Sequence, residues 1–232
     1  MRLHKQIRSV AHAALGPLAT PEFSRIFAWR PLGRRINRDQ WSDPVEVAAY
    51  EAVMAKGWSQ LQRENCEYAE RVALAVEEAY GTVLELGAGC GNMTVWLAKH
   101  PHVVRVVAVE AFGHAAEAIE RLGLTNVEVR VGRVESLSLR GNEHFDTIIA
   151  CELIEHLYPD EEAAMLEEVS RHLVPGARYV VSTPVGWMDD PYHVRGFSPA
   201  RLRRHLSRYY GPVEGSALVA NYSQVAYGRF RQ

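Results

Sequence analysis

From residue 82 onward, short runs rich in β-branched residues alternate with segments of helical periodicity. Such alternation predicts βαβ units, in which parallel strands form one sheet and helices cover both of its faces. The expected strands are 82–86, 103–110, 127–132, 145–151 and 177–184, and the expected helices between them are 92–100, 112–122 and 160–173. The pattern therefore predicts an α/β fold with a doubly wound, mostly parallel sheet.

The two ends of the chain extend this plan. Strand-like runs at 211–220 and 222–230 are separated by Asn221, which predicts a C-terminal β-hairpin. Upstream, Asp43-Pro44 supplies a helix N-cap and a first-turn proline for a helix that runs to residue 58, and a second helix is expected over 60–80. We therefore expect an N-terminal helical cap over residues 1–78 and a ligand-binding α/β domain over residues 79–232.

Composition narrows the class of protein. A chain of 232 residues with 47% hydrophobic residues can bury a sizeable core. None of its apolar runs approaches the roughly 20 residues that a membrane-spanning helix needs, so no membrane span is expected. The three cysteines are few, widely spaced and odd in number, which argues against a disulfide framework and predicts a cytoplasmic location.

Charge is distributed unevenly along the chain. Residues 1–40 hold eight basic against two acidic residues, residues 195–232 hold seven against one, and the segment between them is strongly acidic. Basic segments at the ends of a chain can attract phosphates or nucleic acid, but arginines scattered over solvated helix faces are a simpler explanation of this charge. We therefore expect a small-molecule substrate rather than nucleic acid, with a homodimer left open.

The stretch VLELGAGCGN, residues 83–92, predicts a tight turn between a strand and a helix. Glycines at 87, 89 and 91 let a ligand approach the backbone closely because they carry no β-carbon. The dinucleotide fingerprint has a different glycine spacing, G-x-G-x-x-G. Glu85, two residues before the first glycine, would repel a pyrophosphate and suits a ligand with an ammonium group.

The run E-L-G-A-G-C-G after a strand resembles motif I of class I S-adenosylmethionine-dependent methyltransferases. The resemblance implies a Rossmann-like methyltransferase fold with a seven-stranded sheet and S-adenosylmethionine as cofactor, with Glu85 near its methionine amino group. Glu110 ends the next strand, nineteen residues beyond Gly91, where a carboxylate accepts hydrogen bonds from both ribose hydroxyls. The expected cofactor-binding residues are Glu85, Gly87, Ala88, Gly89, Gly91, Asn92, Glu110, Ala111, Val134, Glu135 and Cys151.

Recognition of the adenine departs from the family pattern. Similar methyltransferases often carry an acid directly after the glycine of VGRVESL, whereas this chain has Arg133 there. The adenine contact is therefore assigned to the Val134 backbone and to Glu135.

CELIEHL, residues 151–157, places two carboxylates and an imidazole after the strand 145–151. It is similar to a segment of small-molecule methyltransferases that faces the transferring methyl group. On a helix, Glu152, Glu155 and His156 would share one face. Three interpretations stay open: acids that favour a helix N-terminus, His156 as a general base, or ligands of a divalent cation.

His193 follows the next strand and sharpens the third interpretation. Glu-x-x-Glu-His with a later His resembles the metal set of small-RNA 3′-terminal 2′-O-methyltransferases, which maps onto Glu152, Glu155, His156 and His193 with Mg²⁺ or Mn²⁺. Asp189 and Asp190 are either additional oxygen ligands or solvated acids of a loop. The same HVRGFSP pattern is also typical of metal-free methyltransferases that act on sugars and other small molecules.

The favoured hypothesis is O-methylation of a sugar-like or natural-product hydroxyl. His156 would be the base, His193 a second acid–base or orienting group, and Glu155 a third catalytic residue. The alternatives are a metal-assisted RNA 2′-O-methyltransferase and a non-catalytic binding protein with a degenerate methyltransferase fold.

Overall fold

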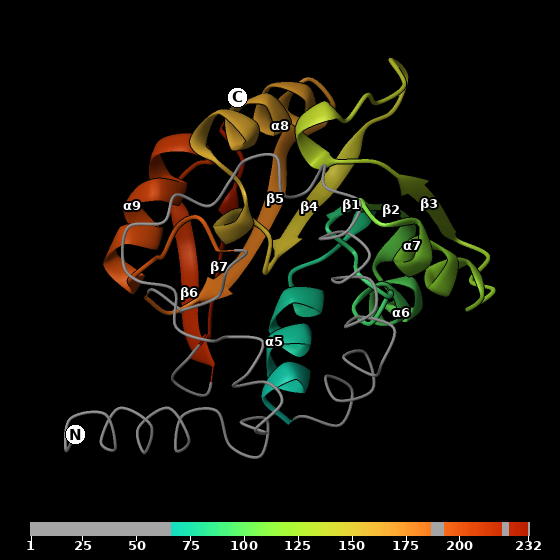
Figure 1. Ribbon diagram of the computed structural model, residues 1–232, viewed down its shortest axis with the longest axis horizontal. Helices are drawn as coiled ribbons and strands as arrows, with labels where there is room; N and C mark the ends of the chain where they lie inside the picture. Colours follow the sequence, from blue (N-terminus) through green and yellow to red (C-terminus); the bar gives the residue numbers. More distant parts are fainter. Residues whose placement is uncertain (1–65, 187–192, 220–222, 232) are drawn as a thin grey trace, which may run out of the picture.

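The computed structural model describes residues 66–186, 193–219 and 223–231 (Figure 1). Seven strands form one sheet in the order β3-β2-β1-β4-β5-β7-β6. The strands are β1 Gly81–Leu86, β2 Val103–Glu110, β3 Val127–Val131, β4 Phe145–Cys151, β5 Leu173–Pro184, β6 Val213–Val219 and β7 Ser223–Arg229. The helices are α5 Cys66–Glu77, α6 Thr94–Lys99, α7 Gly113–Glu120, α8 Pro159–Ser170 and α9 Pro199–Tyr209, with single 3₁₀ turns η4 at Val134–Ser136 and η5 at Ile154–His156.

The strand directions confirm the predicted mostly parallel sheet. Strands β3, β2, β1, β4 and β5 pair in parallel, and β7 runs antiparallel to both β5 and β6. The last two strands form the expected hairpin. Strand order reverses between β1 and β4, and in such sheets ligands bind outside the carboxyl ends of the strands at this reversal.

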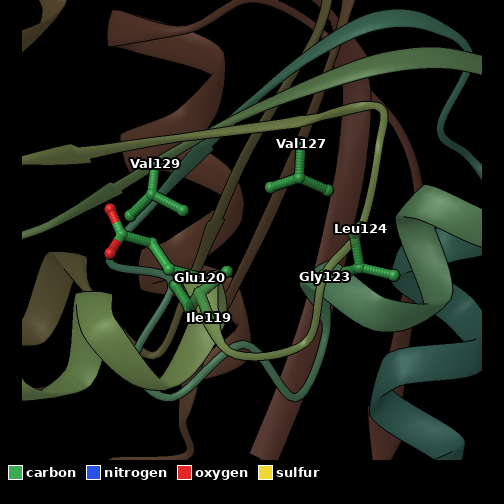
Figure 2. Close-up of a pocket in the computed structure, with 6 residues that line it drawn as sticks. All are labelled: Ile119, Glu120, Gly123, Leu124, Val127 and Val129. Atoms are coloured by element: carbon green, nitrogen blue, oxygen red, sulfur yellow. The ribbon is translucent and has the colours of Figure 1, made fainter.

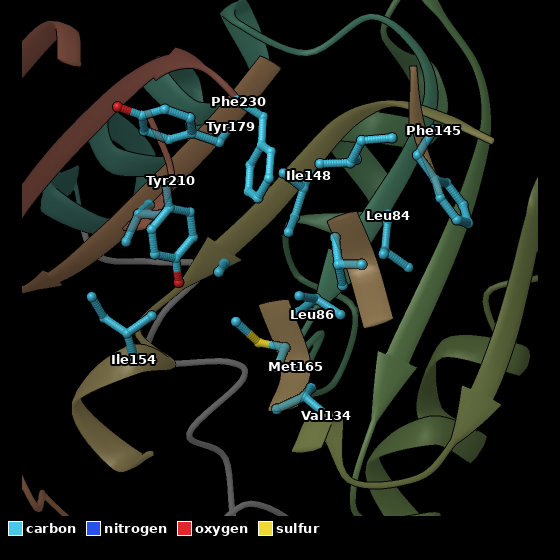
Figure 3. Packing of buried hydrophobic residues seen from close by; sticks show 14 of the residues in the cluster. Leu84, Leu86, Val134, Phe145, Ile148, Ile154, Met165, Tyr179, Tyr210 and Phe230 are labelled. Carbon is cyan, nitrogen blue, oxygen red and sulfur yellow. The ribbon is translucent and has the colours of Figure 1, made fainter. Parts of the chain in front are cut away.

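Helices cover both faces of the sheet, as expected for a doubly wound fold. Helices α5, α6 and α7 lie on one face, and α8 and α9 lie on the other (Figure 1). Apolar side chains of these helices, with those of the two 3₁₀ turns on the second face, pack against the sheet. Figure 3 shows the second layer, where Met165 of α8 and Tyr210 after α9 meet sheet residues such as Ile148. The central strands are buried on both faces, which explains why their sequences are almost continuously apolar.

Helix α5 falls inside the range predicted as a cap. Its residues Val72, Ala75 and Val76 are buried against the same face of the sheet as α6 and α7. The rest of the predicted cap, residues 1–65 with the expected helix that ends at residue 58, lies outside the described residues. Among the described helices, none is long and apolar enough to cross a membrane.

A network of ion pairs, which we call the ionic layer, lies beside β2 and β3 at the outer end of the sheet. In the described structure the chain between β3 and β4 forms only the turn η4, so no α-helix covers this end of the face. Side chains alternate along a strand, and Glu128 and Arg130 of β3 point to this side together with Arg105 near the start of β2. The network consists of Arg105, Glu128, Arg130, Arg140 and Glu143.

Candidate active site

The glycine turn follows β1, and its amides are hydrogen-bonded to the carboxyl end of β2. Gly87, Gly89 and Gly91 all have positive φ, at 71°, 56° and 82°, a conformation that glycine adopts without steric cost. The amide of Gly89 donates to Oε2 of Glu110 at 2.7 Å, so the second strand's acid also shapes the turn. A β-carbon on Gly91 would lie 2.9 Å from Cγ1 of Ile119, so its lack of a side chain is also required by packing.

Glu85 is a buried carboxylate at the base of this turn. Its side chain is 3% exposed and accepts a hydrogen bond from Oγ1 of Thr94 at 2.8 Å. The Glu85 pKa is raised to about 8: burial raises it most, the Thr94 hydrogen bond lowers it, and the nearby charge of Glu110 raises it. Such a group is stabilised by a cation, and the amino group of a methionine-like ligand would supply one.

Glu110 is similarly buried at the end of β2, with 6% of its surface exposed. Burial raises its pKa, while hydrogen bonds from the amides of Phe112, Gly89 and Ala111 lower it. Each carboxylate oxygen has two lone pairs, so Glu110 keeps acceptor capacity for a ribose. The buried acid, the glycine turn and this second acid therefore fit S-adenosylmethionine.

The remaining expected cofactor residues have different environments. Val134 is buried, and Glu135 is half-buried and paired with Arg133. Cys151 ends β4, and burial raises the pKa of its thiol to about 12, so it is a neutral, apolar neighbour. Ala88 is buried, Asn92 is half-buried and Ala111 is exposed.

Glu152 does not lie on a helix, so it does not share a helix face with Glu155 and His156. The chain forms only the turn η5, and Glu152 before it has a φ of +51°, in a conformation that non-glycine residues seldom adopt. This backbone bend removes Glu152 from the face of Glu155 and His156. Its Oε1 instead lies 3.2 Å from the Arg71 guanidinium and accepts hydrogen bonds from the hydroxyls of Ser182 at 2.9 Å and Ser223 at 3.1 Å.

Glu155, His156 and His193 converge, although Glu152 is not among them. Their ligand atoms lie within 4.8 Å of one another, and the two imidazole rings are 4.7 Å apart in an edge-on arrangement. Glu155 is 1% exposed, and within the described part of the chain neither of its carboxylate oxygens has a hydrogen-bond partner of normal geometry. Burial, and then the charge of Glu152, raise the Glu155 pKa well above its usual range.

Several residues near this cluster carried no sequence signal. Arg71, Ser182 and Ser223 surround Glu152, and Glu162 and Arg195 flank η5. Each makes its contact across more than 29 positions of the chain, which local periodicity cannot reveal. Asp189 and Asp190 lie outside the described residues.

A pocket occurs elsewhere, between α7 and β3 (Figure 2). Leu124, Val127 and Val129 line it together with the end of α7. Because Val127 begins β3, the pocket lies at the amino end of that strand, away from the edge that carries the acids and histidines. It is therefore not part of the candidate site.

Comparisons with known proteins agree with S-adenosylmethionine as the ligand that fits the glycine turn. Residues 83–176 match a family described as a methyltransferase domain. N-methyltransferase 4 of Papaver somniferum is 28% identical over 119 residues, which are 50% of this chain and only 28% of that relative's length. The chain thus spans little more than a quarter of that protein.

Two solved structures share the fold. N-methyltransferase NodS from Bradyrhizobium japonicum WM9, in complex with S-adenosyl-L-homocysteine, is 18% identical with a TM-score of 0.61 over 73% of this chain and 90% of that one. The 1,6-didemethyltoxoflavin-N1-methyltransferase of Burkholderia thailandensis, with its substrate and S-adenosylhomocysteine bound, is 19% identical with a TM-score of 0.62 over 93% and 92% of the two chains. Both contain the demethylated form of the cofactor that fits the glycine turn.

Proposed function

We propose that the chain is a class I S-adenosylmethionine-dependent methyltransferase that methylates a hydroxyl group of a sugar-like or natural-product small molecule. Residues 83–176 match a methyltransferase domain, and the fold is shared with an N-methyltransferase bound to S-adenosyl-L-homocysteine. One observation carries the proposal. The cluster of Glu155, His156 and His193 follows β4 and β5 at the same sheet edge as the glycine turn after β1. A nucleophile held by the cluster would therefore lie beside the cofactor.

The cofactor, when bound, supplies an electrophilic methyl group on a positively charged sulfur. The protein's own residues do the rest by binding and orientation. Glu85 would pair with the cofactor's ammonium group, Glu110 would accept hydrogen bonds from its ribose hydroxyls, and the glycines would let the cofactor approach the main chain closely. Methyl transfer is an in-line displacement, so holding the acceptor oxygen in line is the largest contribution required of the site.

Proton removal is the second requirement. A ring nitrogen of His156 accepts the proton of the acceptor hydroxyl as the new bond to carbon forms. Glu155 and His193 lie close enough to orient this imidazole and to stabilise the positive charge that it gains. Closure of the site to water strengthens these interactions.

The test is His156→Ala, with exposed His114→Ala as the matched control. Loss of the base predicts a fall in kcat of about 10²- to 10⁴-fold with cofactor affinity retained. Radiolabelled methyl transfer to a panel of sugars and phenols gives the rates, and calorimetry gives the affinity. Full turnover by the His156 variant would exclude this base.

A second candidate function, metal-assisted methylation of an RNA 2′-hydroxyl, is favoured by the same cluster. Two imidazoles and a buried carboxyl group form a donor set that suits a divalent transition metal. This candidate predicts activity that a chelator abolishes and Mn²⁺ restores, and RNA affinity that falls steeply with salt. Chelator-insensitive turnover of a small molecule would decide against it.

A further inference from the structure

The cluster of Glu155, His156 and His193 is built from two separate segments of chain, the turn η5 and the segment 193–197. They are joined through one carbonyl: the amides of Val194 and Arg195 donate to the main-chain oxygen of Glu155 at 2.8 and 3.2 Å. These two bonds bring His193, the preceding residue, beside Glu155 and His156. The geometry of the cluster therefore depends on how firmly the two segments stay together.

Arg195 adds a side-chain bridge between the same segments. Its Nη2 donates to the carbonyl oxygen of Ile154, the residue before Glu155, and its Nη1 donates to Oε2 of Glu162 at 2.7 Å. The Arg195 side chain is 10% exposed, and its guanidinium lies 5.4 Å from the centre of the Phe197 ring. A buried arginine of this kind is held in one geometry because each lost bond would leave a charge poorly compensated.

Glu162 anchors this bridge on the scaffold. It belongs to α8, and its other oxygen accepts hydrogen bonds from the Tyr210 hydroxyl at 2.8 Å and from Nε2 of His205 at 2.9 Å. Burial by itself raises the Glu162 pKa, but His205 and Arg195 more than offset it, so the pKa is lowered and the carboxylate stays ionised. The bridge thus connects the turn η5 to α8 and, through His205 and Tyr210, to α9 and the residue after it.

From these contacts we infer that Arg195 is a positioning residue for methyl transfer. Anchored on Glu162, its guanidinium holds η5 against the segment 193–197, so that Glu155, His156 and His193 converge. We call Arg195, Glu162 and the Ile154 carbonyl the Arg195 clamp. The inference rests on the proposed function for its kinetic consequence, while its structural part stands on the contacts alone.

The planar guanidinium group of Arg195 suits this role because its nitrogens can donate in different directions. It donates in two directions, to a carbonyl on one side and a carboxylate on the other. A lysine carries the same charge but presents it at one point, so it cannot keep both bonds in the same geometry. Arg195→Lys therefore separates geometry from charge.

The first experiment measures hydrogen–deuterium exchange of the Val194 and Arg195 amides in the full chain, and needs no substrate. The clamp predicts slow exchange in the wild type and exchange about tenfold faster in Arg195→Lys and Arg195→Ala. Added guanidinium ion should restore protection in Arg195→Ala, because it refills the site between Glu162 and the Ile154 carbonyl. Arg201→Lys is the control: Arg201 also lies over the Phe197 ring, at 5.3 Å, and bonds the Gly196 carbonyl, but it is exposed and does not contact η5.

The second experiment measures kinetics in the same variants. Displacement of the cluster predicts a fall in kcat of about 10- to 100-fold with the KM for cofactor unchanged, and partial recovery of Arg195→Ala with guanidinium. Wild-type protection in Arg195→Lys, or an equal loss in Arg201→Lys, would overturn the clamp. A wild-type chain that methylates no acceptor would instead refute the proposed function, and the exchange data would still decide the clamp.

Discussion

At the scale of single residues, Glu85 has the most unusual environment. A carboxyl group that is buried without a cation pays a desolvation cost when it ionises. The raised pKa of about 8 means that the folded chain holds this proton more tightly than the unfolded chain, whose reference value is 4.5. Binding of a cationic ligand should lower the Glu85 pKa, because the cation stabilises the ionised carboxylate.

The cofactor-free protein should therefore lose stability as pH rises. The contribution of Glu85 is fully present below pH 4.5 and is lost progressively as pH rises to about 8, since the folded state is then forced to carry a buried charge. Urea unfolding at a series of pH values checks this. Glu85→Gln should flatten the decline, whereas Glu117→Gln, an exposed acid on α7, should leave it unchanged. An identical decline in Glu85→Gln would contradict the assignment.

How far single residues could be predicted depends on the range of their contacts. Glu85 and Glu110 were predicted because each needs only a strand and its end, which the β-branched runs mark. The position of Glu152 could not be predicted, because its contact with Arg71 spans 81 positions and its positive φ has no local sequence signal. Glu162 was missed for the same reason, because its partners come from the segment after β5 and from α9.

At the scale of elements, the ionic layer replaces an α-helix over β2 and β3. Glu143 is its centre: its side chain is 7% exposed and pairs with Arg130, which donates from Nη1 at 2.8 Å. The amide of Arg140 donates to the same carboxylate at 2.9 Å. The Glu143 pKa is lowered to about 2, because the hydrogen bond from Arg130 lowers it by more than burial raises it.

Glu143→Gln should destabilise the protein by about 2 kcal/mol at neutral pH, because it leaves Arg130 without its main partner. A lowered carboxyl pKa stabilises above pH 4.5 and loses its effect as pH falls toward 2, so the difference from wild type should shrink over that range. Thermal or urea unfolding measures both. Glu167→Gln, which removes an exposed pair with Arg171, should change stability by less than about 0.5 kcal/mol. Equal effects from the two variants would contradict the account of this layer.

Element types were largely predictable, and their ends less so. The predicted strand 103–110 and helices 112–122 and 160–173 correspond to β2, α7 and α8. Strand β5 begins at Leu173, four residues before its predicted start, because Gly176 adopts a φ of +75° and the pairing with β4 shifts register near Phe145. A bulged strand of this kind contains Pro-Gly, which by local rules marks a turn.

At the scale of the whole molecule, the sheet brings together residues that are more than 100 positions apart. Glu85 lies near the end of β1 and His193 follows β5, and the shared carboxyl edge of the sheet is what would place them in one site. Helix α5 completes the face behind this edge and supplies Arg71 to Glu152. The proposed cap over residues 1–78 therefore includes a helix that the domain core needs.

Two shortened chains test this boundary. A chain of residues 66–232 should keep cofactor affinity and lose acceptor turnover, because it retains α5 and lacks the rest of the proposed cap. A chain of residues 79–232 should unfold at lower urea concentration, because it loses the buried residues Val72, Ala75 and Val76. Calorimetry and methyl-transfer assays measure these outcomes. Full turnover by residues 66–232 would refute the cap, and full stability of residues 79–232 would refute the role of α5.

The central claim is that a buried acid ahead of a glycine turn receives a ligand with a cationic amino acid group. Calorimetric titration of the full chain with S-adenosylhomocysteine at pH 7, repeated in buffers of different ionisation enthalpy, tests it most directly. The account predicts one binding site with release of a proton from Glu85, and no binding of a nicotinamide dinucleotide. Absence of S-adenosylhomocysteine binding, or binding of the dinucleotide in its place, would contradict it.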